Sequence, residues 1–184
     1  QPKVLLLDEP LSAIDAKLRK SLQTSIRRIH KDLGLTSVFV THDQDEAMVM
    51  SDVIHLFHDG KIEQSGSPVE VYTKPVTSFA AGFIGNYNIL DSRAMELITG
   101  KKWKDGQIAI RPETFFLSRN EITTEDYCMQ GTITDSVPRG NVLRYTININ
   151  DVEVYADVLF RSTSMYNIGD KLNIGVSDRN CVRL

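Results

Sequence analysis

Long apolar runs are missing from this sequence of 184 residues. No stretch approaches the roughly 20 consecutive apolar residues that a helix needs to cross a bilayer. The N-terminus also lacks the basic start and the apolar core of a signal peptide. We therefore expect any association with a membrane to be made through another protein.

The sequence also has no excess of positive charge. The sequence holds 21 Lys and Arg residues against 24 Asp and Glu residues, which gives a formal net charge of −3. No segment combines clustered Lys and Arg with a run of aromatic residues, as a nucleic-acid-binding surface would. We therefore expect no nucleic-acid partner.

Cysteine is scarce too. Cys128 and Cys181 are far apart and show neither a C-x-x-C pattern nor the spacing of metal ligands. This usage excludes a disulfide scaffold and favours thiols in a reducing compartment. Of the four histidines, only His42 lies in a pattern that suggests more than a structural role.

The composition, with 41% hydrophobic and 24% charged residues, is typical of a globular protein with one or two cores. The aliphatic run Val4–Leu7 predicts a parallel strand that is buried on both faces. Apolar residues at intervals of three and four predict a helix from Leu18 to Leu33, with Asp15 as its N-cap and Gly34 as its stop. A second strand is expected at Ser37–Thr41. Strand, helix and strand in this order predict a βαβ unit whose two strand ends lie side by side.

Further elements are expected along the rest of the chain. Asp43 and Glu46 have the spacing of a capping box, and Asp59-Gly60 is a hairpin turn signal. Ser67 and Pro68 open another helix, and a last helical piece closes at Gly85. After about residue 90 the pattern is all β, and six short strands are expected near 108–111, 115–118, 129–134, 142–149, 152–159 and 172–176. We therefore predict two domains, at residues 1–88 and 89–184, the second a small barrel or sandwich.

Two carboxylates, Asp8 and Glu9, follow the first strand directly. The carboxyl edge of a parallel sheet is where open α/β folds bind their ligands. One carboxylate could hold Mg²⁺ while the other reaches a phosphoryl group under attack. Acidic residues after buried strands also form turns or cap helices, and the pattern taken alone leaves both interpretations open.

The neighbouring strand ends in Thr41-His42-Asp43, which brings an imidazole to the same edge of the sheet. A histidine there can bond a terminal phosphate and the attacking water. The alternative is a solvated histidine ahead of a capped helix, and it would be favoured if His42 stood alone.

Three segments together resemble the ABC ATPases. Val4–Pro10 resembles their Walker B strand, Leu11–Asp15 their D-loop, and Thr41–Ala47 their switch-histidine motif, in the order and spacing of the family. The resemblance implies ATP and Mg²⁺ as cofactors. It places Asp8 in the Mg²⁺ shell, Glu9 on the hydrolytic water, His42 at the γ-phosphate, and Asp15 in a loop that faces a second ATPase subunit.

The resemblance continues into the second half of the chain. Gly60–Tyr72 is similar to the importer subclass that carries a C-terminal TOBE or OB-like domain, which includes maltose, polyamine, sulfate, ferric-iron and phosphonate ATPases. Ile110–Glu113 matches the Ile-Arg-Pro-Glu motif of such domains, where we favour a structural turn with an Arg111–Glu113 salt bridge over ligand contact. The implied fold is an α/β P-loop NTPase (RecA-like) remnant with parallel strands, followed by a small all-β OB-like barrel.

The implied function is that of the ATP-binding and hydrolysing subunit of an ABC importer, which drives solute uptake through a membrane permease. The implied partners are a second copy, the permease subunits and, indirectly, an external solute-binding protein; the implied location is cytoplasmic, on the inner face of the cell membrane. The sequence holds no G-x-x-x-x-G-K-S/T loop and no Ser-Gly-Gly-Gln signature, so we expect a C-terminal fragment that is inactive alone and leaves apolar surface uncovered in residues 1–60.

Two other classes share some of these features. Soluble ABC ATPases of DNA repair have the same strand-end carboxylates, but they lack the hairpin and the small β-domain. A non-catalytic module for dimerisation or ligand sensing is the other alternative, and it is compatible with the importer interpretation.

Overall fold

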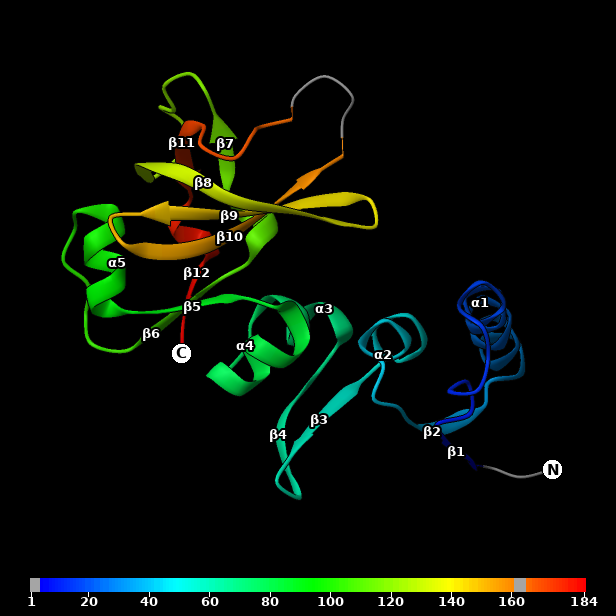
Figure 1. The fold of residues 1–184 in the computed structure, drawn as a ribbon. Helices are drawn as coiled ribbons and strands as arrows, with labels where there is room; N and C mark the ends of the chain where they lie inside the picture. The colour runs from blue at the N-terminus through cyan, green and yellow to red at the C-terminus, as the bar shows by residue number, and fades with distance from the viewer. Residues whose placement is uncertain (1–3, 161–164) are drawn as a thin grey trace. The chain divides into compact units, whose positions relative to one another are not determined.

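The computed structural model describes residues 4–160 and 165–184, with the backbone alone at Ala16 (Figure 1). The chain divides into two compact units, residues 1–74 and 75–184. Residues 78–91 contribute to the second unit, because its first helix packs on its first two strands. The predicted domain boundary between residues 88 and 89 stays a prediction.

The first unit begins with the predicted βαβ arrangement. Its strands β1 and β2 are parallel and in register from Val4 opposite Thr36 to Asp8 opposite Val40. The remaining elements are two short helices and an antiparallel hairpin. In chain order the elements are β1 (Val4–Asp8), α1 (Ala16–Leu33), β2 (Thr36–Val40), α2 (Gln44–Met50), β3 (Ile54–His58), β4 (Lys61–Gly66) and α3 (Pro68–Thr73).

Helix α1 begins and ends where the sequence predicts. The Asp15 side chain accepts hydrogen bonds from the amides of Lys17 and Leu18, which satisfies two of the free N–H groups of the first turn. Gly34 takes the left-handed conformation at φ 59° and its amide donates to the His30 carbonyl. The N-cap role predicted for Asp15 is therefore confirmed.

The prediction that β1 is buried on both faces is wrong. One face of the two-stranded sheet is half-buried, whereas Leu6 is 73% exposed and Val38 52% exposed on the other. Among the described residues, β1 and β2 pair only with each other, so no further strand covers their outer edges. The apolar surface expected to stay uncovered in residues 1–60 is therefore present.

The β3–β4 hairpin turns at Asp59-Gly60, as predicted. Both residues have positive φ, 49° and 75°, which is the backbone of the tight turn that suits twisted strands. Ser67 and Glu70 complete a reciprocal capping box at the start of α3.

The second unit contains two antiparallel sheets. A curled five-stranded sheet has the order β10-β9-β8-β11-β7, and a three-stranded sheet has the order β12-β6-β5 (Figure 1). In chain order the elements are α4 (Ser78–Gly85), β5 (Asn88–Asp91), α5 (Ser92–Thr99), β6 (Gln107–Ile110), β7 (Phe116–Ser118), β8 (Tyr127–Arg139), β9 (Val142–Ile149), β10 (Val152–Leu159), β11 (Lys171–Val176) and β12 (Cys181–Arg183). All six predicted strands are confirmed.

The core of this unit follows the predicted alternation. Alternate residues of β9 are buried, and Ile133, Tyr145 and Val154 from three adjacent strands are almost inaccessible to solvent. A single cluster of buried apolar side chains joins the two sheets. Arg111 directly precedes a short turn, Pro112–Thr114, and its charged group lies 3.6 Å from that of Glu113 within the turn, so the predicted salt bridge is present.

Three features of the second unit were not predicted. Helix α5 interrupts the expected all-β pattern; Asp91 caps it and Met95 and Ile98 are buried. Its eight residues are at the short end of the range for helices. Strands β5 and β12 are too short to show alternation. Helix α4 ends at Gly85, as predicted, and its C-cap residue Asn86 takes the left-handed conformation.

Candidate active site

The predicted site residues Asp8, Glu9 and His42 lie at the carboxyl ends of β1 and β2. Asp8 is the last residue of β1 and pairs with Val40 in the parallel register. The Glu9 amide donates to the Val40 carbonyl at 2.9 Å, which extends the pairing by one step. The two strand ends therefore lie side by side, as the βαβ pattern predicts.

Glu9 and His42 are in direct contact although 33 positions separate them. The Oε1 atom of Glu9 lies 2.9 Å from Nδ1 of His42. Both side chains face solvent, with 46% of the Glu9 side chain and 73% of the His42 side chain exposed. A substrate could therefore reach both groups without any opening of the fold.

The backbone at Glu9 is unusual. Its φ of 42° lies in the left-handed region, which costs a residue with a Cβ about 1 to 3 kcal/mol. The amide bond to Val40 holds this conformation on one side, and on the other Ser12 donates to the Glu9 carbonyl through its amide at 3.2 Å and its hydroxyl at 3.0 Å. In this conformation the Glu9 carboxylate contacts His42.

The Glu9 contact changes the acid–base behaviour of His42. The hydrogen bond to the Glu9 carboxylate and the negative charge of that group raise the pKa of His42 above its usual value. Asp43 and Glu46 add smaller effects in the same direction. The protonated imidazole can donate from Nδ1 to Glu9 and present Nε2–H as a second donor.

Hydrogen bonds among Thr41, Asp43 and Glu46 hold the loop that carries His42. The Thr41 hydroxyl donates to Glu46 Oε2 at 2.7 Å and accepts from the Asp43 amide at 3.0 Å. Asp43 caps α2 by accepting from the Glu46 amide, so that half of the predicted capping box is confirmed. The other half is wrong, because the Glu46 side chain turns inward to Thr41 rather than back to its own helix start.

Asp8 and Asp15 are separate from the Glu9–His42 contact. The side chain of Asp8 is exposed at the end of β1, and that of Asp15 bonds the first turn of α1. Within the described part of the chain, no group of three or more His, Cys, Asp or Glu side chains could hold a metal ion. A cation at Asp8 would therefore need most of its oxygen ligands from a substrate and from water.

The Arg19 side chain also contributes to this region, which the sequence did not predict. Arg19 lies on α1 and reaches the carboxylates of Asp43 and Glu46. The one signal in the sequence is that Arg19 and Gln23 are four positions apart, on a helix face next to the apolar stripe.

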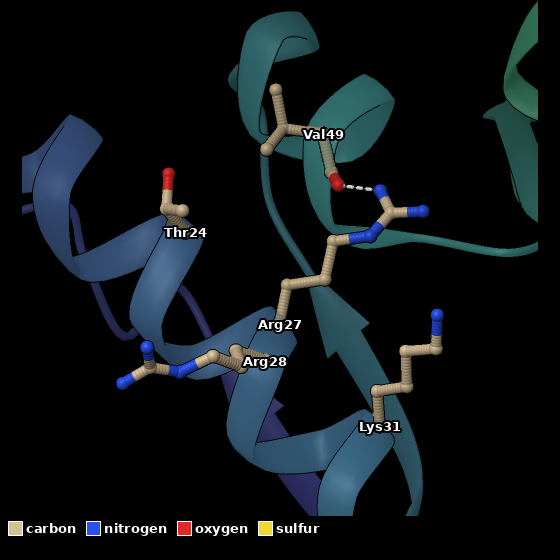
Figure 2. Close-up of a pocket in the computed structure, with 5 residues that line it drawn as sticks. All are labelled: Thr24, Arg27, Arg28, Lys31 and Val49. Atoms are coloured by element: carbon tan, nitrogen blue, oxygen red, sulfur yellow. Dashed lines mark hydrogen bonds between the residues drawn. The ribbon is translucent and has the colours of Figure 1, made fainter.

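A pocket of about 440 Å³ lies elsewhere on the same unit, beside α1 (Figure 2). Three cationic side chains surround it, and Arg27 donates to the carbonyl of Val49 on α2. Its lining residues are Thr24, Arg27, Arg28, Lys31 and Val49. None of the predicted site residues lines this pocket, so it is not the site that the sequence predicts.

No helix in the described part of the chain combines the length and the apolar character needed to span a bilayer.

Comparisons with known proteins match both units. The family model of the TOBE domain matches residues 108–184. A spermidine/putrescine import ATP-binding protein, PotA, of Clostridioides difficile is 41% identical over 165 residues, which cover 82% of this chain and 46% of the relative. The PotA protein of Desulfitobacterium hafniense is 36% identical over 190 positions, covering 96% of this chain and 52% of the relative. An uncharacterized ABC transporter ATP-binding protein of Escherichia coli, YdcT, is 40% identical over 153 residues, covering 83% and 43%.

The chain spans about half the length of the curated relatives it matches. The similarity therefore covers most of this chain, while much of each relative has no counterpart within these 184 residues.

Proposed function

We propose a catalytic role for the first unit of this chain, which belongs to the ABC transporter ATP-binding proteins. The unit supplies catalytic groups for ATP hydrolysis by an importer subunit, and this hydrolysis drives solute uptake through a membrane permease. The observation that carries the proposal is the 2.9 Å contact between Glu9 and His42, directly after Asp8, at the ends of two parallel strands. A carboxylate beside an imidazole at a sheet edge suits proton transfer during phosphoryl transfer to water.

Each site residue has a separate role in this proposal. The Glu9 carboxylate orients the attacking water and accepts its proton. His42 keeps Glu9 in position through Nδ1 and donates from Nε2–H to a phosphate oxygen, where the raised pKa favours the donor form. Asp15 belongs to the loop that faces the second copy, in addition to its observed capping role.

Asp8 is the residue that would hold Mg²⁺. Its exposed carboxylate suits this ion, which takes one or two carboxylates together with waters and phosphate oxygens. Mg²⁺ bound there would neutralise charge on the transferred phosphoryl group. The 184 residues hold no phosphate-loop pattern, so ATP phosphates would be held by groups outside them.

The partners follow from the same proposal. A second copy of the ATPase subunit, permease subunits and, through the permease, an external solute-binding protein would complete the transporter. The protein would work at the cytoplasmic face of the membrane, bound to the permease. The words "spermidine/putrescine import" in the names of relatives make polyamines the first solutes to test.

The proposal is tested by changing Glu9→Gln in the full-length protein. Without a proton acceptor beside the water, turnover of ATP should fall by about 10²-fold or more, while equilibrium ATP binding stays the same. Glu121→Gln is the matched control, because Glu121 is an exposed carboxylate in the second unit. Near-normal turnover in Glu9→Gln would show that Glu9 takes no part in ATP hydrolysis.

A further inference from the structure

A buried carboxylate lies behind the His42 loop. The side chain of Glu46 is only 3% exposed, and its Oε1 atom is 3.8 Å from Nε of Arg19. Nε of Arg19 is itself buried and makes no hydrogen bond within the described part of the chain. Since an ionised carboxylate is costly to bury without a counter-charge, Arg19 and Glu46 are bound to each other electrostatically.

The guanidinium of Arg19 also reaches the second carboxylate of the loop. Its Nη1 atom donates to Asp43 Oδ2 at 3.3 Å. The other carboxylate, Glu46, bonds the Thr41 hydroxyl, which in turn accepts from the Asp43 amide. Arg19 is therefore linked to the residues on both sides of His42.

The third direction of the guanidinium points to the segment that carries Glu9. The Nη2 atom of Arg19 donates to the Ile14 carbonyl at 2.8 Å. Ile14 donates in turn to Leu11, and Ser12 bonds the Glu9 carbonyl, so the segment 9–14 is a series of tight backbone turns that ends at Arg19. One side chain thus joins the two loops that supply the two partners of the 2.9 Å contact.

We propose that Arg19 is a positioning residue for the Glu9–His42 pair, whose guanidinium locks the loop 41–43 against the segment 9–14. The inference rests on the proposed function and adds a residue that touches neither member of the pair. A guanidinium presents several donors in a rigid fork, so it can bond Asp43 and the Ile14 carbonyl while its charge faces Glu46. A Lys ammonium is a single point charge that cannot span all three groups.

The test is Arg19→Lys in the full-length protein. The substitution keeps a positive charge near Glu46 but loses the fork, so the protein should fold while the pair is held loosely. We expect kcat for ATP hydrolysis to fall about 10-fold, and KM for ATP to change less than about 2-fold, because only the geometry of the reacting groups is altered. In a His42→Ala background, Arg19→Lys should have no further effect on kcat.

The matched control is Arg28→Lys on the same helix. Arg28 is exposed, and Figure 2 shows its side chain extending away from Val49 and α2. Both kinetic constants should stay at the wild-type value.

A second variant keeps the test valid if Arg19→Lys fails to fold. Arg19→Gln combined with Glu46→Gln removes both buried charges together, so no orphan carboxylate is left, yet the link between the loops is still lost. It should show the same selective fall in kcat as Arg19→Lys. A thermal unfolding scan checks that both variants are folded.

The outcomes separate the two proposals. A wild-type kcat in Arg19→Lys, with Glu9→Gln and His42→Ala inactive, overturns the positioning role and leaves the proposed function standing. A lowered unfolding temperature with normal kcat per folded molecule also overturns it, because Arg19 would then be structural only. Wild-type turnover in Glu9→Gln and His42→Ala would overturn the function itself.

Discussion

At the scale of residues, the chemistry proposed for the first unit depends on one contact. Glu9 adopts a left-handed backbone conformation and its backbone bonds Val40 and Ser12. His42 follows the neighbouring strand, and the residues on its two sides, Thr41 and Asp43, bond each other. Both side chains remain open to solvent. Backbone strain beside an exposed acid–base pair is typical of functional positions rather than of structural ones.

The raised pKa of His42 leads to a direct prediction. In this chain, the imidazole should titrate above its usual pKa, and Glu9→Gln should bring the value down, because the main cause of the shift is the Glu9 carboxylate. The Glu9–His42 contact contributes to folding stability below the ordinary histidine pKa, and the contribution is lost as pH rises through the raised value. NMR titration of the ring protons measures the pKa, and denaturant unfolding at several pH values measures the stability.

Asp52→Asn is the control for this titration. Asp52 is an exposed carboxylate of the same unit and is not among the groups that shift the His42 pKa. An unchanged His42 pKa in Glu9→Gln would show that the two side chains are not in contact in solution.

At the scale of elements, most of the fold could be predicted from local patterns. Several elements lie where expected, because the residues that form them favour that backbone conformation locally. They are the aliphatic run before Asp8, the helix caps Asp15 and Gly34, and the turn Asp59-Gly60. The strand-end position of Glu9 and His42 could also be predicted, because the βαβ topology brings those two strand ends together.

Tertiary contacts explain what local patterns missed. The apolar stripe predicted on α1 is only partly covered, with Leu18, Ile29 and Leu33 exposed, while the polar Gln23 is buried. A helical period locates a helix but does not say which neighbour covers which face. The roles of Arg19 and Glu46 are of this kind, because they depend on three segments meeting around one guanidinium.

At the scale of the whole molecule, the two units differ in how completely they bury apolar groups. Ile133, Tyr145 and Val154 belong to a closed core, whereas Leu6 and Val40 in the first unit are mostly exposed. Burial of apolar area is the main source of folding free energy, and stability is small even for complete domains. The two units should therefore open with different free energies.

Hydrogen exchange on the 184-residue chain measures this difference. We expect slow amide exchange around Ile133, Tyr145 and Val154, and faster exchange around Leu6 and Val40. Greater protection at Leu6 and Val40 would mean that a partner covers the exposed sheet of the first unit in solution.

The most direct test of the central claim, that Glu9 and His42 act as one catalytic unit, is a double-mutant cycle on ATP turnover by the full-length protein. Glu9→Gln, His42→Ala and the combination are compared with wild type, and each variant is checked for folding and ATP binding. Since groups that act as a unit are not additive, the double variant should lose about as much turnover as the more damaging single change. Losses that multiply, or turnover near wild type in either single variant, would contradict the claim.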